Sequence, residues 1–156
     1  MEIIKARKEH SEDVYKLICE LEGCESDRQA FQNVYSRNLE NNSIYYFLAA
    51  EDAQIIGFAS LHIQHLLHHS ARIGELQEII VRRENRGTGA GKKLFDCIKK
   101  TAAVRGCLQL EISCRQTRTE SHEFYLRQGA ANTHFKFTMA LTDCPEYISC
   151  TVHAPD

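Results

Sequence analysis

A predicted strand and a predicted helix are joined by the stretch Val81-Arg82-Arg83-Glu84-Asn85-Arg86-Gly87-Thr88-Gly89-Ala90-Gly91-Lys92-Lys93. Backbone N–H groups at the start of a helix lack an intrahelical partner, so with the helix macrodipole they form a site for an anion. Glycine lets a phosphate approach such a backbone closely. The alternative is a tight turn whose small residues serve only packing. The spacing matches neither the G-x-G-x-x-G pattern nor the P-loop pattern G-x-x-x-x-G-K-[ST].

Hydrophobic periodicity predicts the elements on both sides of this turn. Val14, Leu17, Ile18 and Leu21 recur at helical spacing, which predicts a helix over residues 11–22 with Ser11 as its cap. Asp27 is expected to cap a second helix that carries apolar residues as far as residue 39. Helices are also predicted from the glycine-rich turn to about residue 105 and over 119–128, and strands over 3–6, 44–50, 55–64, 73–82, 108–113 and 134–141.

This order of elements predicts an α/β sandwich: a mostly antiparallel central sheet flanked by about four helices. Three consecutive strands with short connections favour antiparallel hairpins. No segment within residues 1–141 has the composition of a linker, so we expect a single domain over 1–141 and a C-terminal tail over 142–156.

Length, charge and apolar runs indicate a single domain and argue against a nucleic-acid-binding or membrane-spanning protein. The 156 residues suit one domain. With 19 Lys and Arg against 21 Asp and Glu, the net charge of −2 argues against nucleic-acid binding through bulk charge. The longest uninterrupted apolar run, residues 45–50, is too short to cross a membrane. The first residues have no apolar stretch of signal-peptide length, so we expect a cytoplasmic protein.

Two motifs carry a family resemblance. Arg86-x-x-Gly89-x-Gly91 fits the acyl-CoA signature [QR]-x-x-G-x-[GA] of the GNAT superfamily of N-acetyltransferases, and residues 124–130, FYLRQGA, are similar to a second motif of that superfamily. The resemblance covers about residues 2–141. A narrower resemblance, to the bacterial aminoalkylphosphonate N-acetyltransferases, rests on residues 14–21, 61–69, 73–78 and 134–138. Arg118 and Ser121 depart from the superfamily pattern, where Asn and Ala are common.

The resemblance implies a GNAT-type sandwich with acetyl-CoA as cosubstrate. It places pantetheine alongside Ile79, Ile80 and Val81. It places the pyrophosphate over the turn made by Arg86, Gly87, Thr88, Gly89, Ala90, Gly91 and Lys92. A backbone N–H near residues 79–81 would hold the acetyl oxygen, where a donor gains strength as negative charge develops.

The same resemblance suggests two catalytic residues. Glu78 is the candidate general base for the amine, and in regular alternation Leu76 and Ile80 would share its face of the strand. An alkylammonium with a pKa near 10.4 and an ordinary carboxylic acid near 4.3 differ by about 6 units, so direct proton transfer costs about 8 kcal/mol unless the site or a water assists. Tyr125 is the candidate general acid for the departing thiolate. The alternatives are a surface or ion-paired Glu78 and a core aromatic Tyr125.

Candidate acceptor residues lie in two regions. In the family that the chain resembles, the first two helices and their connection cover the acceptor site, which here implies Tyr15, Asp27, Arg28 and Phe31. A solvated helix charge is the alternative for Arg28. Four histidines fall between residues 62 and 69. One hypothesis is that His62, His68 and His69 line the substrate site and hold a divalent metal that grips a phosphonate. The other is that they are polar loop residues.

The resemblance therefore predicts an enzyme that transfers an acetyl group from acetyl-CoA to the primary amine of a small aminoalkylphosphonate, such as aminomethyl-, 1-aminoethyl- or 2-aminoethylphosphonate, by direct attack on the thioester. One alternative is acetylation of an amino sugar, polyamine or aminoglycoside by the same fold. The other is a catalytically silent acyl-CoA-binding module. Homodimers are common among such proteins, but the sequence itself does not identify an interface.

Overall fold

The computed structural model describes residues 1–141 and divides the chain into two compact units, Met1–Glu111 and a second that begins at Ile112. A five-stranded sheet in the order β1-β2-β3-β4-β5 forms the framework. The strands are β1 (Glu2–Lys5), β2 (Ile44–Glu51), β3 (Gln54–Leu66), β4 (Ala71–Val81) and β5 (Cys107–Ile112). The pairs β1–β2, β2–β3 and β3–β4 are antiparallel, which confirms the predicted hairpins and the α/β class.

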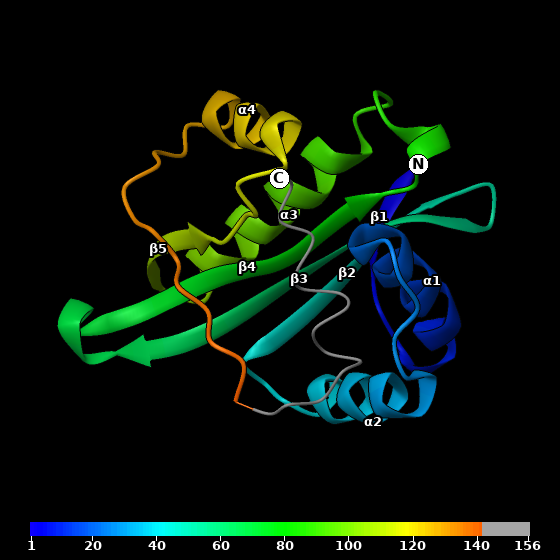
Figure 1. Cartoon of the computed structure of the whole chain (residues 1–156), viewed down its shortest axis with the longest axis horizontal. Helices are drawn as coiled ribbons and strands as arrows, with labels where there is room; N and C mark the ends of the chain where they lie inside the picture. The colour runs from blue at the N-terminus through cyan, green and yellow to red at the C-terminus, as the bar shows by residue number, and fades with distance from the viewer. Residues whose placement is uncertain (142–156) are drawn as a thin grey trace. The chain divides into compact units, whose positions relative to one another are not determined.

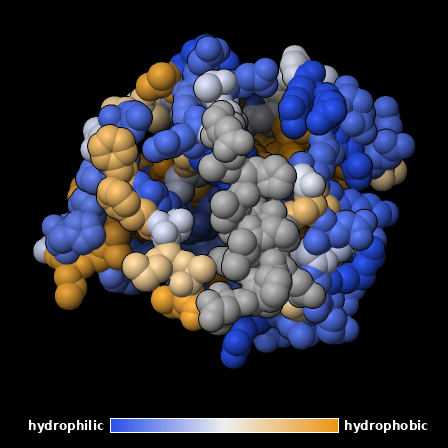
Figure 2. All heavy atoms as spheres, in the orientation of Figure 1, coloured by the Kyte–Doolittle hydropathy of each residue, from blue (hydrophilic) through white to orange (hydrophobic). Residues whose placement is uncertain are grey.

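Three helices belong to the first unit: α1 (Ser11–Glu22), α2 (Arg28–Leu39) and α3 (Ala90–Val104). Figure 1 shows α1 and α2 on one side of the sheet and α3 on the other. Val14 and Leu17 of α1 and Tyr35 of α2 form one buried cluster with Leu48, Phe58 and Ile80 of the sheet. The outward surface over α1 and α2 is mostly hydrophilic in Figure 2, as expected for amphipathic helices.

Short 3-10 helices connect some of these elements. They are η1 (Lys8–His10), η2 (Leu67–His69) and η3 (Arg83–Asn85). Helix α4 (Thr119–Arg127) belongs to the second unit. No helix in the described part of the chain is long and apolar enough to cross a membrane.

The two predicted helix caps have different outcomes. The Asp27 carboxylate accepts a 2.8 Å hydrogen bond from the Ala30 N–H, so the predicted cap of α2 is confirmed. The predicted Ser11 cap is wrong, because Ser11 is already the first residue of α1 and His10 occupies the capping position. The His10 imidazole instead accepts a hydrogen bond from the Arg7 N–H. The preceding turn η1 therefore fixes where α1 begins.

The predicted strand over residues 134–141 is not formed. These residues have no regular secondary structure, and Phe135, Phe137 and Met139 are 81%, 91% and 85% exposed. Alternation of apolar and polar residues favours a strand only where a neighbouring strand supplies hydrogen bonds and an apolar face. No such pairing is present among the described residues of this segment. The predicted tail, residues 142–156, lies outside the described residues.

Gly57 allows α3 to approach the sheet closely. A Cβ at this position would lie 2.9 Å from the Ile80 carbonyl oxygen and 3.1 Å from Leu94 Cδ1 of α3. Gly91, at the start of α3, has more room, since its nearest neighbour would be Val81 Cγ2 at 3.7 Å.

We predict that Gly57→Ala lowers the free energy of unfolding by about 1–3 kcal/mol, because the added methyl overpacks the contact between α3 and the sheet. Urea denaturation monitored by circular dichroism would measure the change. Gly91→Ala is the control, and it should leave stability unchanged or raise it because alanine favours a helix. Equal effects of the two substitutions would contradict the role of Gly57.

Candidate active site

An irregularity in the pairing of β3 with β4 decides on which face of the sheet Glu78 lies. Ala59 of β3 pairs with Ile79 of β4, but Leu61 pairs with Leu76. Two residues of β4, Gln77 and Glu78, therefore lie opposite the single residue Ser60, which is the arrangement of a β-bulge. The bulge corrects the expected alternation: Ile80 shares the face of Glu78 with Phe58, whereas Leu76 lies on the opposite face.

Ser60 holds both ends of Glu78. The Ser60 hydroxyl donates a hydrogen bond to the Glu78 carboxylate, and its oxygen accepts a 3.1 Å hydrogen bond from the Glu78 N–H. Ser60 is completely buried and is the one buried polar residue of the described core. The sequence analysis missed this residue because a serine between Ala59 and Leu61 looks like an ordinary strand residue. The register of β3 against β4 is the signal that identifies it.

Tyr46, Ser60 and Glu78 form a row across β2, β3 and β4. Tyr46 pairs with Ser60 in the β2–β3 register, so their side chains share a face. The Tyr46 hydroxyl accepts a 2.6 Å hydrogen bond from the Asn38 amide of α2. Burial raises the pKa of Tyr46, the Asn38 hydrogen bond lowers it, and the negative charge of Glu78 raises it. The phenol therefore stays neutral beside Glu78.

His62 lies on the same face, two residues after Ser60, and pairs with Glu75. Burial lowers the pKa of His62, while the charges of Glu78 and Glu75 act in the opposite direction. Burial has the larger effect, so the imidazole is neutral at pH 7. The structure therefore brings Glu78 and one of the three candidate histidines to one face of the sheet.

A continuous line of aromatic contacts connects this face to the two helices above it. Each ring lies between 5.2 and 5.9 Å from the next, measured between centroids. Such spacings suit stacked or edge-to-face packing. The rings belong, in order, to Tyr15, Phe31, Tyr35, Tyr46 and Phe58.

Each candidate acceptor residue of α1 and α2 makes contacts within this helical cover. The Tyr15 hydroxyl donates to the Ser26 carbonyl at 2.8 Å, and Phe31 packs between Tyr15 and Tyr35. Arg28 lies 4.5 Å above the Tyr15 ring and 2.6 Å from the Glu12 carboxylate. Asp27 is used as the helix cap. The Arg28 charge is therefore already partly neutralised by Glu12.

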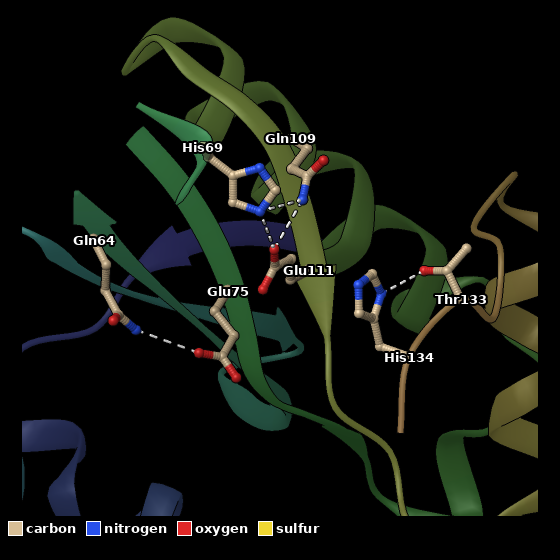
Figure 3. A network of polar contacts seen from close by, with 7 residues as sticks. All are labelled: Gln64, His69, Glu75, Gln109, Glu111, Thr133 and His134. Carbon is tan, nitrogen blue, oxygen red and sulfur yellow. Dashed lines mark hydrogen bonds and ion pairs between the residues drawn. The ribbon is translucent and has the colours of Figure 1, made fainter. Parts of the chain in front are cut away.

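The other two candidate histidines lie at the tip of the β3–β4 hairpin. His68 and His69 are adjacent in η2, with ring centroids 4.3 Å apart. Figure 3 shows the His69 imidazole next to Glu111 and Gln109. The distance from His69 Nε2 to the Glu111 carboxylate is 3.4 Å. Across residues 1–141, no group of three or more His, Cys, Asp or Glu side chains is arranged to hold a metal ion. The structure therefore does not support a metal site formed by His62, His68 and His69.

The glycine-rich turn has the backbone geometry that the sequence suggested. Gly87 and Gly89 adopt φ of 81° and 88°, a region that favours glycine. Gly89 is the N-cap of α3, and its carbonyl accepts the 3.1 Å hydrogen bond from the Lys93 N–H. The N–H groups of Ala90, Gly91 and Lys92 thus belong to the unpaired first turn of the helix. Thr88 donates to the Asn85 carbonyl at 2.8 Å and closes the turn.

The end of β4 leads directly into this turn. Ile79, Ile80 and Val81 pair with Ala59, Phe58 and Gly57 on the β3 side. On the other side, Leu110 of β5 approaches Gly74, which lies in the first half of β4. Ile79 and Val81 remain partly exposed, whereas Ile80 is buried at 4%.

Tyr125 belongs to α4 in the second unit and packs edge-to-face with Phe124, with centroids 5.5 Å apart. Burial, with a smaller contribution from Cys114, raises the pKa of Tyr125 to about 12, although Arg118 acts to lower it. The phenol therefore keeps its proton at neutral pH and can donate it.

Comparisons with known proteins agree on one family. The model of the Acetyltransferase (GNAT) family matches residues 11–130. The aminoalkylphosphonate N-acetyltransferase of Salmonella typhimurium is 39% identical over 140 residues, which cover 90% of this chain and 91% of that protein.

Solved structures share the fold at low sequence identity. A transcriptional regulator from Bacillus halodurans C-125 has a TM-score of 0.82 at 15% identity, covering 90% of this chain and 99% of that one. Glucosamine-6-phosphate N-acetyltransferase from Arabidopsis thaliana has a TM-score of 0.77 at 17% identity, covering 90% and 98%. With the matched family model and the 39% identical relative, the chain belongs to the GNAT family of acetyltransferases and is an acetyl-CoA-dependent N-acetyltransferase.

Proposed function

We propose that this acetyltransferase acetylates the primary amine of small aminoalkylphosphonates. The observation that carries the proposal is the 39% identity to an aminoalkylphosphonate N-acetyltransferase along nine-tenths of both chains. The same stretch of sequence includes the elements that position Glu78 and the glycine-rich turn. Specificity can change with few residues on one fold, so the acceptor needs a direct test.

In the proposed reaction the amine nitrogen attacks the thioester carbonyl of acetyl-CoA, the carbon–sulfur bond breaks, and an amide and a free thiol result. The unpaired amides at the start of α3 suit the pyrophosphate of the coenzyme, because they point fixed positive dipoles at an anion. The segment 79–81 suits pantetheine, since Ile79 and Val81 are partly exposed and the segment lies beyond the contact between β4 and Leu110.

Glu78 is proposed to accept the proton of the ammonium, directly or through a water. Its carboxylate is held by Ser60 on a face that also carries Tyr46 and the neutral His62. These surroundings contribute neutral polar groups beside the negative charges of Glu78 and, next to His62, of Glu75. A cationic amine is therefore attracted to this face, while partial burial assists its loss of a proton.

Tyr125 is proposed to donate to the departing sulfur. With a pKa of about 12, its phenol is a weaker acid than a thiol with an ordinary pKa near 8.5. Complete proton transfer would therefore climb about 3.5 units, or about 5 kcal/mol. We infer that a hydrogen bond from Tyr125 to the developing thiolate contributes first, and that the proton moves as charge accumulates on sulfur.

Thiol release from acetyl-CoA with a panel of amines tests the substrate class. The panel contains aminomethylphosphonate, 1- and 2-aminoethylphosphonate, glucosamine, spermidine, an aminoglycoside and, as the matched control, ethylamine. We expect kcat/KM to be highest for the aminoalkylphosphonates and at least about tenfold lower for ethylamine, a matched amine without the phosphonate. Preference for a sugar or polyamine would overturn the phosphonate proposal. If the protein binds coenzyme A but acetylates none of these amines, it is an acyl-CoA-binding module without catalytic activity.

We predict that Glu78→Gln lowers kcat/KM at pH 7 by about 10²-fold or more, because the amine loses its proton acceptor. The loss should shrink as pH rises, since more of the free amine is then already deprotonated. Rates measured from pH 6 to 10 would give the ratio of wild type to variant. A ratio that stays constant across this range would exclude Glu78 as the base.

Two further variants separate the chemistry of Glu78 from its position. Ser60→Ala keeps the carboxylate but removes its buried hydrogen-bond partner, so kcat should fall while the pH dependence of the wild type is retained. Glu75→Gln changes the next carboxylate on β4 and should alter kcat by less than about threefold. A larger loss of kcat in Glu75→Gln than in Glu78→Gln would show that Glu78 is not the base.

For Tyr125→Phe we expect kcat to fall by about 10²-fold, because the proton donor for sulfur is lost. Steady-state kinetics with acetyl-CoA would measure the loss. Tyr35→Phe is the matched control: it also removes a tyrosine hydroxyl, one that donates to the Arg7 carbonyl at 2.8 Å, and it should lower stability with little change in kcat. An unchanged kcat in Tyr125→Phe would show that the acid assignment is wrong.

A further inference from the structure

A cavity lies where β1 ends and β2 begins, next to the C-terminal ends of α2 and α3. Its volume is about 330 Å³, and its walls include Lys5, Asn41, Asn42, Tyr45, Phe47 and Arg105. A smaller hollow of about 230 Å³ shares four of these residues and adds Lys100. The larger volume is at the lower end of the range for small-molecule sites.

The charges around this cavity are all positive. The residues that line the two hollows include three cations, Lys5, Lys100 and Arg105, and no carboxylate. Within residues 1–141, none of these cations forms an ion pair, unlike Lys8 with Glu40 or Lys92 with Asp96. Three neighbouring cations repel one another unless an anion binds between them.

Arg105 is well placed to bind such an anion. Its N–H donates to the Thr101 carbonyl at 2.9 Å, and its own carbonyl accepts from the Arg72 guanidinium at 3.0 Å, so its backbone is fixed. Its guanidinium carbon lies 5.1 Å from the centre of the Tyr45 ring. A guanidinium held over an aromatic ring keeps N–H donors that match two oxygens of a phosphate.

The cavity reaches the Glu78 row at Tyr46, but neither Ser60 nor Glu78 is among its lining residues. Phe47 pairs with Ala59 and Lys5, and these residues alternate with those of the Glu78 row, so their side chains point to the α3 side of the sheet. The glycine-rich turn lies at the opposite end of α3, and fifteen residues of helix span about 22 Å. Neither Glu78 nor the coenzyme turn therefore contributes to the cavity.

We propose that this cavity, together with the smaller hollow that shares four of its residues, is a second binding site, which takes a small phosphate-bearing anion. Two ammonium groups and one guanidinium suit a dianion better than a single carboxylate. Asn41 and Asn42 line the same cavity, and an asparagine amide can donate hydrogen bonds to the remaining oxygens of the anion. Free phosphate and a phosphate monoester share this chemistry.

Residue-resolved NMR tests the site. The ¹⁵N-labelled protein is titrated with inorganic phosphate, and separately with glycerol phosphate, at constant ionic strength. We expect saturable shifts at the amides of residues 41–45 and 100–105. Tighter binding of glycerol phosphate would indicate a monoester ligand, and tighter binding of phosphate would indicate the free ion; both outcomes support the site. Shifts confined to residues 86–92, or no saturation, would overturn it.

Neighbouring lysines of α3 provide the control. Lys100 lines the hollow, whereas Lys99 lies 5.9 Å from the Phe95 ring and does not. Lys100→Gln and Arg105→Gln should each weaken binding about tenfold, which is the effect of losing one charge-assisted hydrogen bond. Lys99→Gln should leave the affinity unchanged. An equal loss in Lys99→Gln and Lys100→Gln would show that only the general surface charge attracts the anion.

Discussion

The position of the Glu78 side chain depends on one contact in the sheet. Ser60 of β3 lies opposite two residues of β4, Gln77 and Glu78, which form a bulge. In a regular ladder, Leu76 and Glu78 would occupy the same face, and an apolar side chain would lie where the row of polar groups now runs. The extra residue reverses the alternation for the first half of β4. Leu76 thereby enters the core on the α3 side at 1% exposure, while Glu78 stays on the α1 and α2 side.

Ser60 stabilises this arrangement because its buried hydroxyl forms its hydrogen bonds with Glu78. A buried hydroxyl without a partner is costly, and a bulge leaves the backbone of the longer strand unpaired at one point. Both requirements are met by the same two hydrogen bonds, one to the Glu78 N–H and one to its carboxylate. The side chain of Glu78 is then oriented by the buried Ser60 hydroxyl. A preoriented carboxylate of this kind favours proton transfer.

The aromatic line from Tyr15 to Phe58 joins this face to the helices that cover it. Tyr15, Asp27, Arg28 and Phe31 all have contacts inside that cover, so their positions are fixed by the fold itself. On the opposite face, the absence of a side chain at Gly57 lets α3 approach β3 and β4. That approach brings the unpaired amides at the start of α3 close to the end of β4.

Local patterns in the sequence determined most elements of the fold. Helical periodicity gave α1 its full span, Asp27 identified the start of α2, and the spacing of Gly87 and Gly89 identified a turn with unpaired amides. Each of these features depends on residues within a few positions of one another, so short-range chemistry is sufficient to specify them. The tertiary structure alone decided the bulge, the role of Ser60, the separation of His62 from His68 and His69, and the exposure of residues 134–141. Those features depend on which residues lie opposite one another across strands, and cross-strand partners are set by packing between segments that are distant in the chain.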